Sequence, residues 1–380
     1  MKSREMCDEQ MLVEEPMSDS PISMNQSYDP ASIPEYPFPM EQIPRMSIND
    51  PRLQHLIETS QPVVITDSQL VQPALKWNLR YLKSNLGDGL YYVYSSHNNR
   101  FKYFDKERAK QCSSFKQPTT RKEVAFSDFI EMLKKCNEST ERIYLQQTLN
   151  DTVGPNIVQD YLQFNWHFVS RIQSKMQWGD LSSNLLLIGQ EGNITPVHYD
   201  EQENFFAQVS GFKRCLLFSP DQFECLYPHP VSHPCDRQSQ VNFSNPDYQR
   251  FPKFRDAHAV EAIVGPGDVL YIPMYWWHQI ESLASAEPYD HGFTDDAASS
   301  CGSDTSDEDI PPVTVSVNFW YRSSPLPQQI EYPISAQQRV SVMRNIEKMV
   351  GAVMGSPDEV ANLLRTIVDG RYNMTSREAT

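Results

Sequence analysis

Two residues that can ligate a transition metal, His198 and Asp200, lie two positions apart within the segment 195–220. The phenylalanines and valines around them are typical of a strand, and the period of two in a strand turns both side chains to one face. We expect a third ligand from His278, which follows a Gly-Pro-Gly-Asp turn and the apolar strand that comes after it. Two imidazoles and one carboxylate are the facial triad that leaves open positions on Fe(II).

A lysine at a suitable place strengthens this interpretation. Lys213 follows His198 by fifteen residues and begins the strand after the Ser210-Gly211 turn. A dicarboxylate that chelates iron through its 2-oxo acid end needs a cation for its far carboxylate, and Lys213 could supply it. A His-x-Asp pair alone is weak, because two polar residues at a strand end are common. With His278 and Lys213 added, the residues favour an oxygenase that uses Fe(II) and 2-oxoglutarate.

Four long motifs resemble those of the JmjC-class asparaginyl hydroxylases that inhibit hypoxia-inducible factor: residues 195–220, 233–254, 265–283 and 316–321. The resemblance extends from about Ser32 to Asn373. It implies a protein asparaginyl β-hydroxylase that uses Fe(II), 2-oxoglutarate and O2. Its substrates would be the C-terminal activation segment of hypoxia-inducible factor and ankyrin-repeat proteins, and it would act as an oxygen sensor that represses transcription. The alternatives are another JmjC oxygenase, such as a lysyl hydroxylase or histone demethylase, or a non-catalytic ankyrin-binding module.

The resemblance also implies roles for individual residues. The metal ligands and catalytic residues would be His198, Asp200 and His278. The cosubstrate would be bound by Tyr144, Thr195, Asn204, Lys213 and Asn318. The peptide would be bound by Tyr103, Asp151, Leu181, Ser182, Asp200, Glu201, Gln202, Arg237, Gln238 and Trp320. Without the motif match, a lone Tyr or Thr would be interpreted as a core residue, and an Arg-Gln pair in a polar loop would be interpreted as exposed. The Gln238 amide does suit a primary carboxamide, because it can both donate and accept hydrogen bonds.

The expected fold is mainly β, a double-stranded β-helix or jelly-roll of the cupin kind with flanking helices. Short strands separated by Gly and Pro turns run from Asn184 to Arg322 and are typical of that architecture. We place the core barrel at about 182–323, inside an oxygenase domain at 32–334. Further strands are expected at 62–68, 89–96, 100–105, 142–149 and 182–189, and helices at 72–87, 124–135 and 157–165.

A pair of helices is expected at the carboxyl end of the chain, in residues 335–373, before a tail at 374–380. Apolar residues recur at helical spacing from Val340 to Val353, and Ser356 begins a capping box with Pro357 at the first helical position. Such helices could pack on their own barrel or on a second copy, and the resemblance implies a homodimer.

The net charge of −16 comes mostly from two segments. Residues 1–30 contribute −5 and residues 284–312 contribute −8, which leaves about −3 for the remainder. We therefore expect no direct binding to nucleic acid. Residues 1–31 and the acidic insertion at 284–312 are predicted to be disordered. The insertion would interrupt a hairpin between 278–283 and 314–321, with its base near the active-site end.

The insertion could be a regulatory segment or a solvated spacer. Thr305 and Ser306 each have an acidic residue three positions later, the pattern of an acidophilic kinase site. The seven cysteines form no CxxC pair, which favours reduced thiols. No apolar run is long enough for a membrane span, and the first ten residues lack the apolar core of a signal peptide. These features together predict a protein of the cytoplasm and nucleus.

Overall fold

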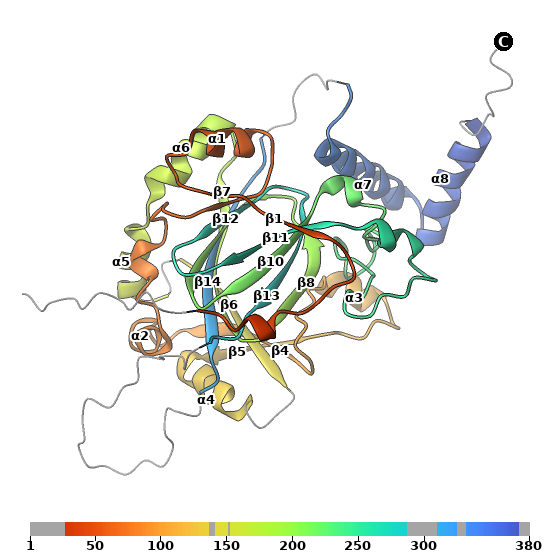
Figure 1. Ribbon diagram of the computed structural model, residues 1–380. Helices are drawn as coiled ribbons and strands as arrows, with labels where there is room; N and C mark the ends of the chain where they lie inside the picture. Colours follow the sequence, from red (N-terminus) through yellow and green to blue (C-terminus); the bar gives the residue numbers. More distant parts are fainter. Residues whose placement is uncertain (1–26, 137–140, 151–152, 287–309, 325–331, 372–380) are drawn as a thin grey trace, which may run out of the picture.

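Two β-sheets form the centre of the computed structural model, which describes residues 27–136, 141–150, 153–286, 310–324 and 332–371 (Figure 1). The smaller sheet has the order β1 (Met40–Gln42), β11 (Ala259–Val264), β10 (Lys213–Phe218), β13 (Trp277–Ser282) and β8 (Ile194–Tyr199). The larger sheet has the order β2 (Arg45–Met46), β3 (Val63–Ile65), β12 (Val269–Ile272), β9 (Glu203–Ser210), β14 (Val313–Tyr321), β7 (Leu181–Gln190), β6 (Arg142–Thr148), β4 (Leu90–Ser96) and β5 (Thr120–Ala125). This arrangement confirms the expected jelly-roll.

The hydrophobic core has three parts, one between the sheets and one on each outer side. Side chains from both sheets meet in the middle, among them Phe206, Leu217, Ile272 and Ile280. The alternation of the strands then places the intervening residues outside; Val197 and Tyr199 of β8, for example, belong to the outer cluster of the smaller sheet. Because His198 lies between these two residues, its side chain points inward.

Helices cover the outer face of the larger sheet (Figure 1). They are α1 (Pro51–Glu58), α2 (Leu79–Asn85), α4 (Phe126–Cys136), α5 (Pro155–Leu162) and α6 (Trp166–Met176). The outer face of the smaller sheet is covered by irregular chain, chiefly the segment 223–257 and the lead-in at Tyr36 and Phe38. Short 3-10 turns lie at Pro30–Ser32, Gln72–Ala74, Pro220–Gln222 and Pro252–Asp256. Among the described helices, none is long and apolar enough to cross a membrane.

The two helices expected near the carboxyl end are confirmed as α7 (Ala336–Val353) and α8 (Pro357–Arg371), while α3 (Lys106–Gln111) lies near the same side of the molecule (Figure 1). A capping box begins α7: the Ser335 hydroxyl accepts from the backbone of Gln338, whose side chain accepts from the backbone of Ser335. Ser356 caps α8 by accepting from the Glu359 backbone at 3.3 Å. Only part of the apolar stripe of α7 is covered, since Val340 is buried and Met349 is 65% exposed.

Several expected elements have different bounds. The strand expected at 100–105 is wrong: after a single bridge from Arg100 to Ile194, the chain is irregular up to α3, because Asp105 instead caps that helix. The helix expected at 72–87 is broken at Asn78, which caps α2. The helix expected at 157–165 ends at Leu162. Asn165 caps a further helix, α6, and neither this helix nor β5 was predicted from the sequence.

The hairpin expected on either side of the acidic insertion is also wrong. β13 pairs with β10 and β8 in the smaller sheet, whereas β14 pairs with β7 and β9 in the larger one, so the insertion joins two sheets. Its base is at the end of the barrel where Ser282 pairs with Lys213, away from the metal-binding end where Trp277 pairs with Tyr199. Residues 1–26 and 287–309, with Thr305 and Ser306, lie outside the described residues.

Candidate metal and cosubstrate site

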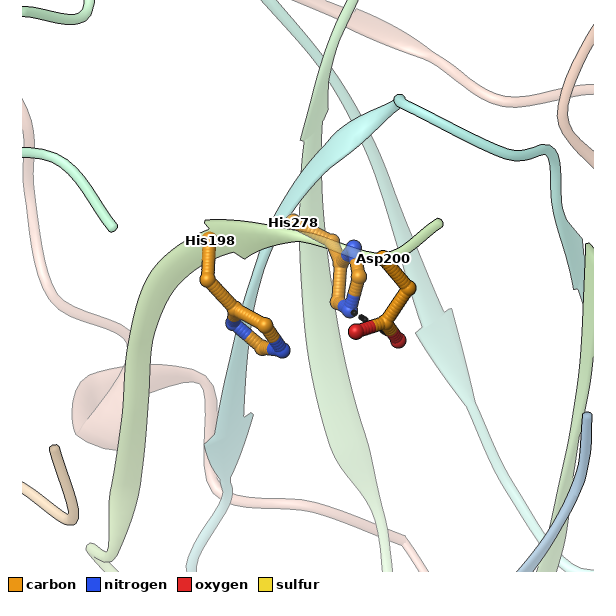
Figure 2. Close-up of side chains that lie close together, drawn as sticks. All are labelled: His198, Asp200 and His278. Atoms are coloured by element: carbon orange, nitrogen blue, oxygen red, sulfur yellow. Dashed lines mark ion pairs between the residues drawn. The ribbon is translucent and has the colours of Figure 1, made fainter. Parts of the chain in front are cut away.

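His198, Asp200 and His278 converge at one end of the barrel interior (Figure 2). His198 is on β8, Asp200 directly follows this strand, and His278 is paired with His198 on the adjacent β13. One ligand atom from each residue lies within 4.8 Å of the others, and in the described part of the chain no other group of His, Cys, Asp or Glu does so. The donor set of two imidazoles and one carboxylate fits Fe(II) with open coordination positions.

Backbone carbonyls orient both imidazoles. Nδ1 of His198 lies 2.9 Å from the carbonyl of Pro196, and Nδ1 of His278 lies 3.0 Å from that of Trp276. A carbonyl only accepts, so each Nδ1 carries the proton and each Nε2 keeps its lone pair. Nε2 of His278 lies 3.7 Å from the Asp200 carboxylate. The structure therefore presents two Nε2 atoms and a carboxylate to one point, as a metal site requires.

The electrostatic environment also suits metal binding. Burial and the neighbouring His278 lower the pKa of His198 to about 4, which keeps this imidazole neutral near pH 7. Burial alone would raise the pKa of Asp200, but the two histidines, Arg237 and a hydrogen bond from Trp320 bring it below its usual value. Because metal ligands must be deprotonated, both residues are in the form that binds.

A cavity of about 750 Å³ opens onto this triad. Tyr144, Thr195, Asn204 and Asn318, all expected to bind a cosubstrate, line it together with the three metal ligands. Its walls include apolar side chains from both sheets, such as Leu187, Phe206, Ile272 and Ile280. A small dicarboxylate that chelates the metal would fit within this volume.

Lys213 lies directly behind this lining rather than on the cavity surface. Its Nζ donates to the Ser316 hydroxyl at 2.9 Å and to the Tyr144 hydroxyl at 3.3 Å. The residue is only 1% exposed, and burial lowers the pKa of its amine to about 7. In the described part of the chain it forms no ion pair, although a buried ammonium is costly without an anion. A carboxylate beside the Tyr144 hydroxyl would supply the missing charge.

Two asparagines on the same wall have unsatisfied amides. Oδ1 of Asn204 and Oδ1 of Asn318 are buried and have no hydrogen-bond partner in the described part of the chain. Buried amides are almost always hydrogen-bonded, so both oxygens are available to a partner within the cavity. Rotation of either amide would exchange oxygen for nitrogen and present N–H donors to a carboxylate.

Arg237 and Gln238 approach the metal site from the segment 227–240, here called the substrate loop. The backbone of Gln238 bridges that of His198, and the Tyr199 N–H donates to the Arg237 carbonyl at 3.1 Å. Arg237 adopts a φ of +69°, rare for a residue with a Cβ, and its guanidinium lies 3.6 Å from the Asp200 carboxylate. Strain of this kind often marks a functional loop.

The other residues expected to bind peptide are distributed around the cavity. Tyr103 and Trp320 line it, and the Gln238 amide donates to the Tyr103 carbonyl. Leu181, Ser182, Glu201 and Gln202 do not line it but lie at the adjacent ends of β7 and β8, where Gln202 donates to the Ser182 hydroxyl. Asp151 is outside the described residues.

Two residues that contact the site were not identified from the sequence. Ser316 is two positions before Asn318 and four before Trp320 on β14, so strand alternation could have placed it on the inner face. Arg344 of α7 reaches the residues next to the metal ligands, and no local pattern points to it.

A double-stranded β-helix with an inward-facing His-Asp-His triad defines the class of cupin-type metal-binding proteins. The family model described as "Cupin-like domain" matches residues 51–326, most of the chain, and the protein belongs to this family.

Curated relatives have related names. The chain is 40% identical over 99 residues to "JmjC domain-containing protein D" of Dictyostelium discoideum, covering 26% of this chain and 22% of the relative. It is 30% identical to "Lysine-specific demethylase 8" of Danio rerio, covering 70% of this chain and 61% of the relative. It is 26% identical to human "HSPB1-associated protein 1", and the match covers 70% of this chain and 48% of the relative. The chain thus spans between about a fifth and three fifths of these relatives.

Proposed function

We propose that this protein is an Fe(II)- and 2-oxoglutarate-dependent protein oxygenase that hydroxylates asparagine. The observation that carries the oxygenase assignment is Lys213, a buried amine without an ion pair in the described residues, beside a cavity that leads to the His-Asp-His triad. A purely structural lysine would be paired or exposed. Membership of the cupin-like family supports the same class.

The protein would hold the cosubstrate at both ends. Lys213 and the Tyr144 hydroxyl would bind the distal carboxylate, while Thr195, Asn204 and Asn318 would hydrogen-bond along the molecule. Fe(II), held by His198, Asp200 and His278, would couple oxidation of 2-oxoglutarate by O2 to hydroxylation of a substrate carbon. The apolar walls at Phe206 and Ile280 would exclude water from this reaction.

The preference for asparagine rests on Arg237 and Gln238. Both line the cavity at the metal, and both offer N–H donors, while Gln238 also offers an acceptor. A primary carboxamide needs donors for its oxygen and an acceptor for its nitrogen. The resemblance to the hydroxylase called factor inhibiting hypoxia-inducible factor supports the same side chain.

The second candidate is a lysine-directed oxygenase, favoured by the name of the Danio rerio relative, a lysine-specific demethylase. A methylated lysine is cationic, however, and it would meet the Arg237 guanidinium 3.6 Å from Asp200. Like charges at close range repel each other. This contact favours a neutral side chain as the substrate.

The proposed partners follow from the resemblance: the C-terminal activation segment of hypoxia-inducible factor and ankyrin-repeat proteins, met in the cytoplasm and nucleus. Because the reaction uses O2, the protein would act as an oxygen sensor, and hydroxylation of the factor would repress its transcriptional activity. A non-catalytic ankyrin-binding module would not require the triad or a buried Lys213, so both features argue against that alternative.

We further propose a homodimer through α7 and α8. Apolar side chains of these helices are exposed, including Ile346, Met349, Val353 and Val368. Contiguous exposed apolar side chains often mark a protein interface. A second copy of the chain, with the same helices, would cover them by two-fold symmetry.

The experiment that tests the function is mass spectrometry on three substrates incubated with Fe(II), 2-oxoglutarate and air. They are an Asn-containing activation-segment peptide, an ankyrin-repeat protein and a methyl-lysine histone peptide. We expect one added oxygen on Asn that requires both iron and 2-oxoglutarate. Loss of methyl groups from lysine, with Asn unmodified, would instead establish the second candidate.

A further inference from the structure

Arg344 of α7 is a buried charge on a largely exposed helix. The residue is 3% exposed, whereas Met343 beside it is 37% exposed and Val342 40%. A guanidinium is buried in this way only when several acceptors satisfy it. Its partners lie far away in the sequence and close to the metal ligands.

The guanidinium of Arg344 joins two separate segments. Toward the substrate loop, Nη1 and Nη2 donate to the two carboxylate oxygens of Asp236 at 2.7 and 3.0 Å. Toward the end of β8, Nε donates to Glu201 at 3.0 Å and Nη1 donates to the Tyr199 hydroxyl at 2.8 Å. Tyr199 and Glu201 flank the ligand Asp200, and Asp236 precedes Arg237.

Further contacts make this junction a charge network. Arg108 of α3 bonds to Asp236 at 3.1 Å, and Lys348 of α7 bonds to Glu201 at 3.2 Å. Burial would raise the pKa of Asp236, but Arg344 and Arg108 bring it below its usual value. This carboxylate is thus ionised near neutral pH and binds the guanidinium through both oxygens, the strongest mode.

We propose that Arg344 is a positioning residue that fixes the distance between the metal-binding end of β8 and the substrate loop. The two segments also meet through backbone contacts, the bridge from His198 to Gln238 and the bond from Tyr199 to Arg237, and through the Arg237 guanidinium 3.6 Å from the Asp200 carboxylate. By holding Asp236 and Glu201 together, Arg344 keeps Arg237 and Gln238 at the metal. The helix α7 thereby sets the affinity for the peptide, an inference that rests on the proposed function.

The variant Arg344→Lys tests this role, because an ammonium keeps the charge but lacks the planar fork that binds both Asp236 oxygens while also reaching Glu201 and Tyr199. The matched control is Arg339→Lys, the same substitution at an exposed position on α7. We expect Arg344→Lys to raise the peptide KM about tenfold with kcat within about twofold, as for other residues that orient a site. Arg339→Lys should leave both constants unchanged. An unchanged KM in Arg344→Lys overturns the proposal.

A second readout does not depend on the substrate. In the full chain loaded with Mn(II) and 2-oxoglutarate, we expect Arg344→Lys to accelerate amide hydrogen exchange in 199–203 and 233–240, and not in β3 or β12. Unchanged exchange in both segments, or equal acceleration throughout the barrel, overturns the positioning role. If the wild-type protein oxidises no asparagine, the proposed function fails, and hydrogen exchange still decides the role of Arg344.

Discussion

The indole Nε1 of Trp320 donates a hydrogen bond to the Oδ2 atom of Asp200 at 3.0 Å. Trp320 is on β14 of the larger sheet, and Asp200 follows β8 of the smaller one. This contact therefore joins the two sheets at the metal site. Since Nε2 of His278 lies 3.7 Å from the same oxygen, the indole fixes the carboxylate in the orientation that faces the imidazoles.

Replacing the indole should weaken metal binding. Trp320→Phe keeps an aromatic ring but loses the donor, so we expect Mn(II) affinity to fall about tenfold, the usual cost of removing an outer partner of a ligand. Metal titration followed by calorimetry measures it. Trp276→Phe is the control, because that indole donates to the Ser60 carbonyl, away from the metal. Equal affinities in Trp320→Phe and wild type would contradict this role.

Removing a ligand should abolish turnover without unfolding the barrel. In His198→Ala we expect Mn(II) binding weaker by about two orders of magnitude or more, with no succinate formed from 2-oxoglutarate. The fold should persist, because both sheets are held by cores that exclude His198. Circular dichroism and succinate assays test both points, with the exposed His167→Ala as control. Retained turnover in His198→Ala would refute the metal assignment.

Lys213 should be required for binding 2-oxoglutarate, and it should destabilise the folded protein when 2-oxoglutarate is not bound. We expect Lys213→Met to abolish cosubstrate binding by calorimetry while raising the melting temperature of the ligand-free protein, because it removes a buried amine that has no ion pair among the described residues. Cosubstrate binding by the variant at wild-type affinity would contradict the assignment.

The same residue predicts a dependence on pH. The folded pKa of about 7 is below the usual 10.5, so between these values the unfolded chain binds one more proton than the folded chain. The stability of ligand-free wild type should therefore rise with pH, by about 1.4 kcal/mol per pH unit from this group. Lys213→Met should lack this contribution. Denaturant titrations of both proteins at pH 7 to 10 give the difference, and parallel curves would contradict the prediction.

Much of the inner face of the barrel could be predicted from local pattern. Two-residue spacing places His198 with Asp200, and the turn before β12 leads to His278. The sheet partners could not be predicted, because β13 and β14 are both buried strands and their side chains do not specify which strand lies beside them. The prediction of a hairpin across the insertion was wrong for this reason.

Contacts between distant elements carried still less local information. Arg344 lies 108 residues from Asp236, on a helix whose pattern indicates only an apolar stripe. Burial of its guanidinium depends on where α7 packs, which tertiary structure alone decides. The irregular chain at 100–105 is a similar case, because its apolar and aromatic residues suit a strand and yet Asp105 caps α3.

Self-association should depend on the exposed face of α7. Met349 is 65% exposed within the apolar stripe, and a charge there would have to be desolvated in an interface. We expect Met349→Glu to convert a dimer into a monomer in sedimentation analysis, with the melting curve of the barrel retained. Lys122→Glu, at an exposed position on the edge strand β5, is the control. A monomeric wild type would refute the dimer.

Gln238 should distinguish peptide binding from cosubstrate binding. Its backbone bridges His198, and its amide donates to the Tyr103 carbonyl, so the side chain is held at the metal end of the cavity. In Gln238→Ala the backbone bridge can persist while the donor and acceptor for a carboxamide are lost.

Peptide hydroxylation by Gln238→Ala should therefore fall by about tenfold or more, the cost of one or two hydrogen bonds to a buried amide. The affinity for 2-oxoglutarate should stay within about twofold of wild type, because Lys213 and Tyr144 are untouched. Equal losses of both would mean that Gln238 supports the cavity as a whole and does not select the substrate side chain.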